Sequence, residues 1–392
     1  MHNRRAMNTI PIIVGLTAIA AAVGAGLLLC CRPAKPVLFV EPVFAGDSRE
    51  LKATRVAPTL EAPIRKGTNT IWCASFLAAW KSLETDIANE PVTLQGAPGV
   101  ALSLDRAPDP RPSIPEESLY VAAGWNDNGI TDQIRKGLAR KFPAKAQPTF
   151  PGILPDSFVA YAYLEASVNF ATPYFQSKSP LVFTDRAGKK TELNSFGIRS
   201  EDDYAYWELR EQPQVLFVAT DDDFKLTQCA VDLDRTSQPN QIVLAIVEPK
   251  STLSEVLADI AEKIDAADRK AKSDLHPTHD DGLGPNDVLL VPDVVWRITH
   301  RFTELEGRKF ANAKLNGRRI DVAQQDIQFS LNRGGAELKS EAKLFVAPVP
   351  TYYVFDRPFI LYMKKRGAKT PYFVMWIENA ELLNKWKPDK KP

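Results

Sequence analysis

The 392-residue chain has few of the residues on which catalysis and metal binding most often depend. It contains only 4 cysteines and 4 histidines. A Gly-rich phosphate loop, a Ser nucleophile elbow and a Cys-x-x-Cys pair are all missing from the sequence. Because 49 Lys and Arg oppose 48 Asp and Glu, the net charge is only +1, which argues against nucleic-acid binding through bulk electrostatics. We therefore expect no enzymatic activity, no cofactor and no nucleic-acid partner.

The few candidate metal ligands lie in segments that are typical of solvated loops and turns. His276 and His279 precede two aspartates in a stretch rich in Gly, Pro and Asp. Imidazole and carboxylate groups at this spacing are possible ligands, but such loops are usually plain connections. Asp221–Asp223 indicates an acidic turn, and His300 in an alternating strand is predicted to be structural. We predict no metal site.

The cysteines do not form the framework of a small disulfide-stabilised protein. Cys30 and Cys31 belong to an N-terminal apolar run, whereas Cys73 and Cys229 stand alone in apolar strand or helix contexts. A Cys73–Cys229 bridge would be permitted in an exported protein, but the sequence does not place the two within bonding distance. Buried free thiols are the favoured interpretation.

The N-terminus carries a segment that is long and apolar enough to cross a bilayer. Arg4 and Arg5 precede an uncharged run from Ile10 to Cys31. The positive leading flank favours an N-inside orientation, with the rest of the chain exported and extracytoplasmic. A cleaved signal peptide with a site among the small residues near 22–26, and lipoprotein processing at Cys30, remain alternatives. We assign residues 1–31 to a signal or membrane anchor.

Residues 32–65 hold five prolines and mixed charges, which predicts a tether. Residues 66–392 are long enough to bury a large core and are assigned to one folded domain. No internal repeat is evident. The many prolines of this domain sit mostly between apolar runs, which is typical of a strand-rich fold.

The richest pattern of the chain runs from Gly334 to Trp376. From Ala336 to Val346, small or apolar residues alternate with Glu and Lys. A period of two predicts a strand with one apolar and one charged face. Pro348 and Pro350 then prevent further pairing inside a sheet. Two dense apolar runs follow, at 354–363 and 372–377, and are joined by a turn-like Lys-Arg-Gly-Ala segment.

These C-terminal segments resemble the corresponding region of the serpin family of protease inhibitors. Residues 355–363, Phe-Asp-Arg-Pro-Phe-Ile-Leu-Tyr-Met, are similar to the serpin block in which Pro-Phe opens an apolar strand. Residues 370–376 resemble the strand that follows it. The segment Gly334, Gly335, Ala336 and Glu337 occupies the place of the serpin hinge, where glycine suits a backbone that changes conformation.

Upstream segments resemble serpins in the same order along the chain. These are 69–80, which is similar to the block that starts a buried helix, the strand and helix pair of 119–125 and 134–142, the central strand 157–164, the Pro-containing element 170–174, and the strand 242–249 with the amphipathic helix 253–264 after it. The resemblance implies an α+β, serpin-like fold with a large central mixed β-sheet and further sheets.

The chain also departs from the family pattern. Cys73, Ala74 and Phe76 replace small polar and Pro residues that form a hydrogen-bonded cluster beneath the serpin sheet, which predicts a packed apolar plug there. Only Pro151 to Asp156 separate two predicted elements where serpins carry a whole helix. We therefore expect reduced helix content, with the front of the sheet partly uncovered.

The resemblance implies a protease inhibitor that offers a bait bond and then inserts its own loop as a sheet strand. The reactive loop would lie near 343–352, with the scissile bond among Ala347, Pro348 and Val349, and the partner would be a serine or cysteine protease. Leu338, Lys339 and Glu341 are bulkier than usual for such a hinge, and the prolines oppose cleavage. The alternative is a non-inhibitory scaffold or binding protein in which 336–346 is a permanent strand.

Overall fold

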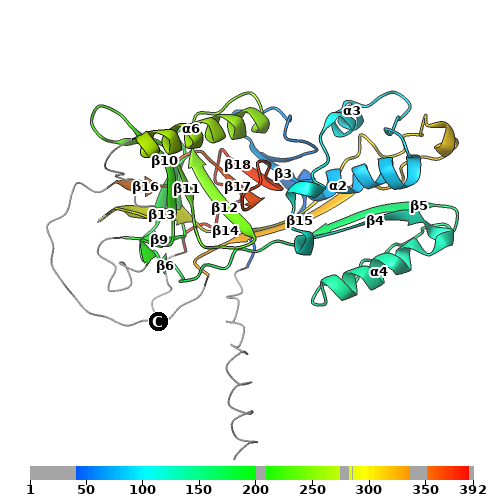
Figure 1. Cartoon of the computed structure of the whole chain (residues 1–392), viewed down its shortest axis with the longest axis horizontal. Helices are drawn as coiled ribbons and strands as arrows, with labels where there is room; N and C mark the ends of the chain where they lie inside the picture. The colour runs from blue at the N-terminus through cyan, green and yellow to red at the C-terminus, as the bar shows by residue number, and fades with distance from the viewer. Residues whose placement is uncertain (1–40, 200–208, 274–281, 285, 335–350, 388–392) are drawn as a thin grey trace, which may run out of the picture. The chain divides into compact units, whose positions relative to one another are not determined.

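A computed structural model describes residues 41–199, 209–273, 282–284, 286–334 and 351–387 (Figure 1). In these residues the strands form five sheets, and four α-helices accompany them. The predicted signal or anchor, residues 1–31, lies outside the described residues. Within the described ranges, no helix combines the length and the apolar character needed to span a bilayer.

The largest sheet has seven strands in the order β10-β11-β12-β17-β18-β3-β2. Neighbouring strands are antiparallel, except that β2 runs parallel to β3. The strands β3, β12 and β18 are buried along their whole length, which explains the continuous apolar runs 242–246 and 373–377, although β3 begins with the buried polar residues Asn69 and Thr70. In sheet order the bounds are Gln214–Thr220, Leu226–Asp232, Asn240–Ile246, Phe359–Lys365, Phe373–Ile377, Asn69–Cys73 and Thr54–Ala57.

Two further sheets contain the strands β15 and β5, between which the candidate site lies. In the first, β14 (Val294–Arg301) lies between β1 (Phe44–Asp47) and β15 (Gln324–Leu331). The second is the antiparallel pair of β4 (Leu119–Trp125) and β5 (Phe158–Leu164). Residues of β15 are alternately exposed and buried, so this strand covers the core with one face.

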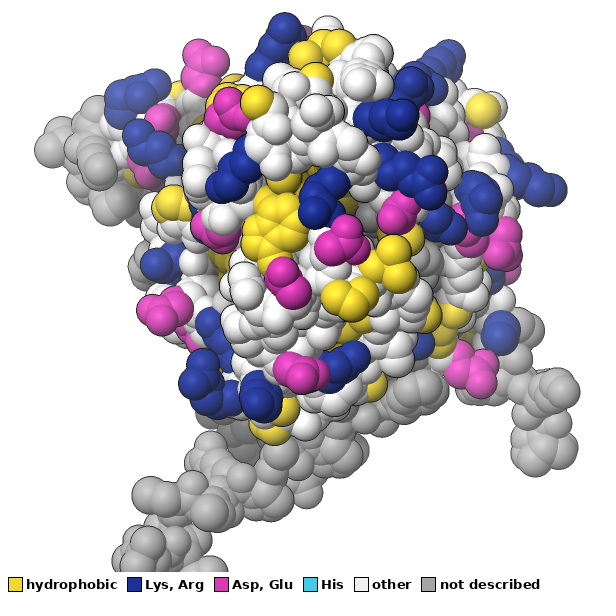
Figure 2. All heavy atoms as spheres, turned by 90° about the vertical axis from the view of Figure 1, so that its right-hand side faces the viewer, with side chains coloured by type: hydrophobic (Ala, Val, Ile, Leu, Met, Phe, Trp, Pro, Cys, Tyr) yellow, Lys and Arg dark blue, Asp and Glu magenta, His cyan; other side chains and the backbone are white. Residues whose placement is uncertain are grey.

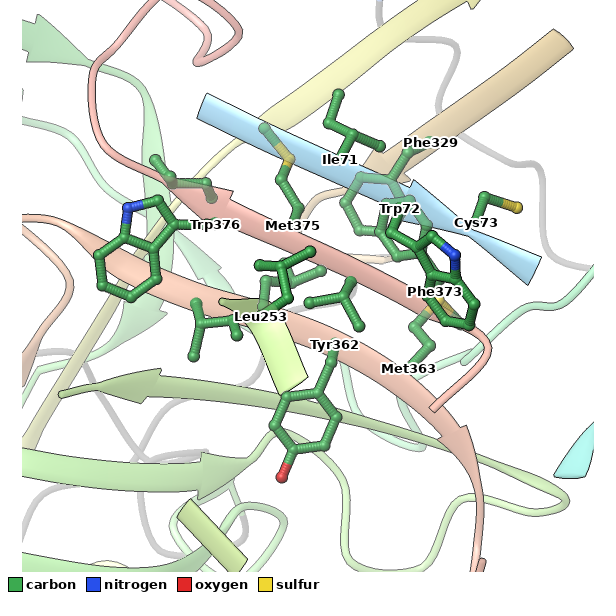
Figure 3. Packing of buried hydrophobic residues seen from close by; sticks show 14 of the residues in the cluster. Ile71, Trp72, Cys73, Leu253, Phe329, Tyr362, Met363, Phe373, Met375 and Trp376 are labelled. Atoms are coloured by element: carbon green, nitrogen blue, oxygen red, sulfur yellow. The ribbon is translucent and has the colours of Figure 1, made fainter. Parts of the chain in front are cut away.

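The sheet of β15 packs on the seven-stranded sheet through aromatic side chains. Phe329 of β15 stacks on Phe373 of β18 with ring centroids 4.7 Å apart, and both lie beside Trp72 in Figure 3. Trp296 of β14 joins the same cluster, 6.3 Å from the Phe373 ring. Offset aromatic contacts of this kind stabilise a core beyond the area they bury.

The remaining strands form two small sheets. One has the order β16-β13-β9-β6, and the other is the hairpin of β7 and β8. Strand β16 resumes the chain after the undescribed residues 335–350 and runs parallel to β13. In the order just given, the bounds are Tyr352–Val354, Val288–Pro292, Ser195–Ile198, Phe175–Gln176, Leu181–Thr184 and Lys190–Leu193.

Two helices sandwich the β4–β5 pair. Helix α2 (Ala74–Ser82) contacts one face, and α4 (Ile130–Lys141) covers the other with Ile134 and Leu138 (Figure 1). The other two are α3 (Gly99–Arg106) and α6 (Leu253–Ser273), of which α6 contacts β10. Short helical turns cover Ser48–Glu50, Leu83–Ala88, Arg111–Ser113, Glu116–Ser118, Asn126–Asn128 and Ala313–Leu315.

The tether predicted for 32–65 differs from what its described part shows. From Phe44 on, the chain adds β1 to the edge of β14 and β2 to the edge of β3. The Glu381 carboxylate fixes the segment between these strands by accepting from the backbone N–H of Lys52 and of Ala53 and from the Thr54 hydroxyl. The two strands have only four residues each, which is too short for a period to be recognised among the prolines.

The predicted fold class is confirmed. The chain is α+β, with a large mixed sheet, further sheets and few helices. Residues 151–156 contain no helix, as the short interval predicted. The helix predicted from Ile134 begins four residues earlier, at Ile130, because Gly129 in a left-handed conformation ends the preceding turn there.

Candidate functional site

Two neighbouring strands each leave one edge without a partner strand in the described part of the chain. Strand β5 pairs only with β4, and β15 pairs only with β14. Helix α2 contacts both strands, and Figure 1 shows β15 extending alongside the β4–β5 pair. We call the region between the two open edges the β5–β15 junction. Unpaired strand edges are ready templates for another strand.

The junction is closed at the end towards which both strands run. The backbone N–H of Tyr174 donates to the carbonyl of Arg333 at 3.1 Å, and the Arg333 side chain returns a bond from Nε to the Tyr174 carbonyl at 3.0 Å. Tyr174 is fully buried and lies ten residues after the end of β5, whereas Arg333 lies two residues after the end of β15. The segments that follow β5 and β15 therefore meet here, as is expected of two strands that run in the same direction.

Aromatic and charged side chains connect the opposite end of the junction. Phe158, the first residue of β5, contacts Phe310 with ring centroids 5.6 Å apart. Arg318 lies over the Trp125 ring, 4.6 Å from its centroid, and forms an ion pair with Asp156 at 3.5 Å. Figure 2, which looks onto this side of the molecule, shows hydrophobic side chains exposed among acidic and basic ones. Contacts between the two parts of the chain thus bridge both ends of the junction.

One side chain from each strand, Tyr161 and Asp326, interacts electrostatically with the other between these ends. Burial raises the pKa of Tyr161 on β5, and the negative charge of Asp326 on β15 raises this pKa further. The two side chains are therefore near enough to interact across the junction. Asp326 is exposed and accepts a hydrogen bond from the Thr299 hydroxyl at 2.6 Å.

Beneath the junction, a hydrogen-bonded link joins β15 to the start of α2. The side-chain Nε2 of Gln325 donates to the Cys73 carbonyl at 3.0 Å and to the Ser75 hydroxyl at 2.9 Å. Its Oε1 is buried and has no partner among the described residues. The prediction of a purely apolar plug is therefore wrong in this respect, because Ser75 and Gln325 keep a polar contact. Phe76 does pack against an aromatic ring, that of Phe302, at 4.1 Å.

The structure describes only the first residue of the predicted hinge. Gly334 has φ +61°, a left-handed conformation that favours glycine, and its N–H donates to the Asn332 side chain at 3.0 Å. The other hinge residues and the candidate scissile bond lie outside the described residues. These are Gly335, Ala336, Glu337, Ala347, Pro348 and Val349.

The weak candidate sites of the sequence do not gather into a catalytic constellation in the described residues. His276 and His279 lie outside the described ranges. Among the residues that the structure describes, no group of three or more His, Cys, Asp or Glu side chains could hold a metal ion. Asp221 is part of a turn, where its carboxylate accepts from the N–H of Lys225, and His300 is hydrogen-bonded to the Ser48 hydroxyl.

Cys73 and Cys229 are both buried and free, in agreement with the favoured interpretation. Burial raises the pKa of the Cys229 thiol to about 12 and also raises that of Cys73. Both thiols are therefore protonated at neutral pH, which makes them poor nucleophiles.

The sequence did not predict the contacts that define the junction. Tyr174 and Arg333 are far apart in the chain, as are Gln325 and Ser75, and no local pattern marks either pair. The residue alternation of β15 is the one signal that was available. It runs from Gln324 to Leu331, immediately before the predicted hinge.

Comparisons with known proteins find similarity only among solved structures. No family model and no curated protein matches the chain. The thermophilic serpin tengpin in its native state is 11% identical, with 81% of this chain and 90% of that chain covered and a TM-score of 0.42. Mouse protein Z-dependent protease inhibitor is 10% identical, with 79% and 91% covered and a TM-score of 0.44.

Human thyroxine-binding globulin complexed with its hormone is similar to the same extent. It is 12% identical, with 80% of this chain and 92% of that chain covered and a TM-score of 0.42. The chain is thus similar to serpins along most of its described length. At such identities and TM-scores the similarity concerns the fold alone and does not indicate an activity.

Proposed function

We propose that this protein is a protease inhibitor of the serpin type, which takes its own segment 336–346 into the β5–β15 junction after cleavage. The observation that carries the proposal is that, among the described residues, β5 and β15 each leave one edge without a partner strand. Because these strands are parallel, one strand that runs in the opposite direction would form antiparallel ladders with both. Antiparallel pairing is the more stable arrangement per residue.

The turn at the end of β15 suggests a register for the inserted strand. With Arg333 and Gly334 as the two central residues of a tight turn, Leu331 would pair with Ala336, Phe329 with Leu338, Ile327 with Ser340 and Gln325 with Ala342. Gly334 already has the positive φ that the second central residue of a type II turn requires.

This register agrees with the alternation of the sequence. The small or apolar residues of segment 336–346 would pair with β15 residues that are all buried, namely Gln325, Ile327, Phe329 and Leu331. The Glu and Lys residues that alternate with them would lie beside exposed residues of β15. A slip by one residue would bury four charged side chains, so the hydrophobic pattern specifies the register.

The chemistry of inhibition would proceed through the normal first step of the protease. The protease nucleophile would attack the carbonyl of a residue among Ala347, Pro348 and Val349, and would form an acyl-enzyme as the next amine leaves. Release of the loop would allow insertion and carry the acylated protease with it. Small apolar residues at this site suggest an enzyme with a small apolar specificity pocket.

Thermal unfolding before and after limited proteolysis tests the proposal. Cleavage between Lys343 and Thr351 should produce a large rise in melting temperature, because the new strand pairs two open edges. Ala342→Lys should abolish this rise, since residue 342 would face the core beside Gln325. Lys343→Ala, on the solvent-facing parity, is the matched control and should retain the rise. An unchanged melting temperature in the cleaved wild-type chain would rule out strand insertion.

The second candidate function is a non-inhibitory scaffold or binding protein. In the register above, Glu341 would lie beside Asp326, and like charges on adjacent strands oppose pairing. Leu338 is also bulky for a strand that must enter a closed core. A chain that is cleaved without thermal stabilisation, and that forms no denaturation-resistant complex with a protease, would support this alternative.

A further inference from the structure

A pocket of about 310 Å³ lies next to the segment that follows β5. Its walls come from four parts of the chain: the helical turn before β4, the residue after α4, residues 165–169, and residues 237–240 between β11 and the start of β12. Polar residues dominate the lining, namely Glu117, Ser118, Glu165, Ser167, Asn169, Ser237, Gln238 and Asn240. A concave site with several converging polar groups is the usual form of a small-molecule site.

The protein uses only some of the hydrogen-bonding groups of this lining: Asn240 donates to the Ser167 carbonyl and accepts from the Tyr372 hydroxyl, and Ser237 donates to the Asp234 carbonyl. Ser118 is only 3% exposed and lines the pocket, yet its hydroxyl forms no hydrogen bond with any described residue. The side chains of Glu117, Ser167, Asn169 and Gln238 are exposed and form no hydrogen bond with the described residues, so they are available to a ligand as well as to water. The Ser118 hydroxyl is not fully enclosed by the protein, so it is open to a hydrogen-bonding partner from the pocket.

The charge of the lining is negative. Glu117 and Glu165 contribute two carboxylates, and none of the described residues that line the pocket is basic. The nearby Lys141 directs its ammonium group to the backbone carbonyls of Glu116 and Leu119 instead. The Glu165 carboxylate accepts one hydrogen bond, from the Tyr163 hydroxyl at 2.6 Å, and retains further acceptor capacity.

Aromatic surface is also present. Phe142, the residue after α4, contributes to the wall and is itself buried. A cation next to an aromatic ring and two carboxylates gains both cation–π and charge-assisted hydrogen-bonding energy. A guanidinium group suits such a site best, because it is flat and carries several N–H donors in a fixed geometry.

We propose that this pocket binds a small organic cation with a guanidinium or primary ammonium group. Glu117 and Glu165 would accept from its N–H groups, Ser118 and Asn169 would complete the hydrogen bonds, and Phe142 would contact its apolar part. The volume is sufficient for a molecule of the size of a free amino acid or a short polyamine.

Isothermal titration of the full chain with agmatine and with spermidine tests this proposal. At least one of these probes should bind with a stoichiometry of one, whereas glutamate should not bind. Glu165→Gln should weaken binding by about tenfold or more, because a charge-assisted hydrogen bond is lost. Glu248→Gln, at an exposed position away from the pocket, is the matched control and should bind like the wild type.

A second variant keeps the test decisive if Glu165→Gln perturbs the fold. Ser118→Leu should fill the pocket and abolish binding while leaving the cooperative unfolding transition in place. The proposal is overturned if neither probe binds at millimolar concentrations, or if binding is equally strong in wild type, Glu165→Gln and Ser118→Leu. Because the readout is binding to the intact chain, the result does not depend on loop cleavage or on strand insertion.

Discussion

Gln325 is the residue that connects the strand next to the hinge with the helix beneath it. Its Nε2 group bonds both the Cys73 carbonyl and the Ser75 hydroxyl. We predict that Gln325→Ala lowers the free energy of unfolding by roughly 2–4 kcal/mol, because it leaves two buried polar groups with one partner fewer. Urea denaturation monitored by tryptophan fluorescence measures this change.

Gln328→Ala is the matched control for Gln325→Ala, since Gln328 lies on the same strand with its side chain exposed. Its effect should stay within about 0.5 kcal/mol, as is usual for surface positions. Equal effects of the two substitutions would mean that the link from β15 to α2 contributes nothing to stability.

His300 should make the stability of the protein depend on pH. Burial lowers the pKa of its imidazole below the ordinary value of 6.5, while Glu304 and Asp47 oppose the shift. The folded state therefore favours the neutral ring, and the unfolded chain takes up the proton more readily. The resulting stabilisation is present above pH 6.5 and is lost as the pH falls from 6.5 towards the lower folded pKa.

His300→Gln should flatten this pH dependence. Urea midpoints at pH 7.5 and pH 5.5 would differ less in the variant than in the wild type. A Gln side chain can still bond the Ser48 hydroxyl, so the comparison isolates the titration from the hydrogen bond. The same acid-induced decrease in both proteins would assign the dependence to other groups.

At the scale of whole elements, β1 and β2 protect the edges of two sheets. A chain that begins at Glu41 retains both strands and should unfold like the full-length protein. A chain that begins at Gly67 loses them, exposes the edges of β14 and β3, and leaves Glu381 without its three donors. We predict a loss of more than about 3 kcal/mol and a tendency to aggregate.

Thermal unfolding and light scattering of the two truncated chains measure this prediction. The difference between them is the informative quantity, because both lack residues 1–40. If the chain that begins at Gly67 were as stable and as soluble as the longer one, residues 41–66 would act as the tether that their prolines suggested.

The elements that the sequence predicted correctly are those with a strong local pattern. Long apolar runs identified β12, β17 and β18, and an amphipathic period identified α6. The four-residue strands β1 and β2 were missed because each buries only a few side chains against a distant partner. The ends of the junction were missed for the same reason, since Tyr174 and Arg333 meet only in the folded chain.

At the scale of the whole molecule, strand insertion would join two sheets that are separate in the described residues. The three-stranded sheet of β15 and the pair β4–β5 would become one sheet of six strands around segment 336–346. The energy for such a change would come from the pairing of the two open strand edges and from burial of the small and apolar side chains of segment 336–346. It would be opposed by the side chains that connect the ends of the junction and by any unfavourable cross-strand contact.

Glu341 provides the sharpest test of this balance. In the proposed register it would lie beside Asp326, which already acts on Tyr161 across the junction. Glu341→Lys would replace a repulsive pair by an attractive one and should stabilise the cleaved form by about 0.2–1 kcal/mol. The measurement is the rise in melting temperature after loop cleavage, compared with that of Glu337→Lys, which would pair with the uncharged Ser330. A larger rise for Glu341→Lys supports the register, whereas equal rises would place Glu341 away from Asp326 and contradict it.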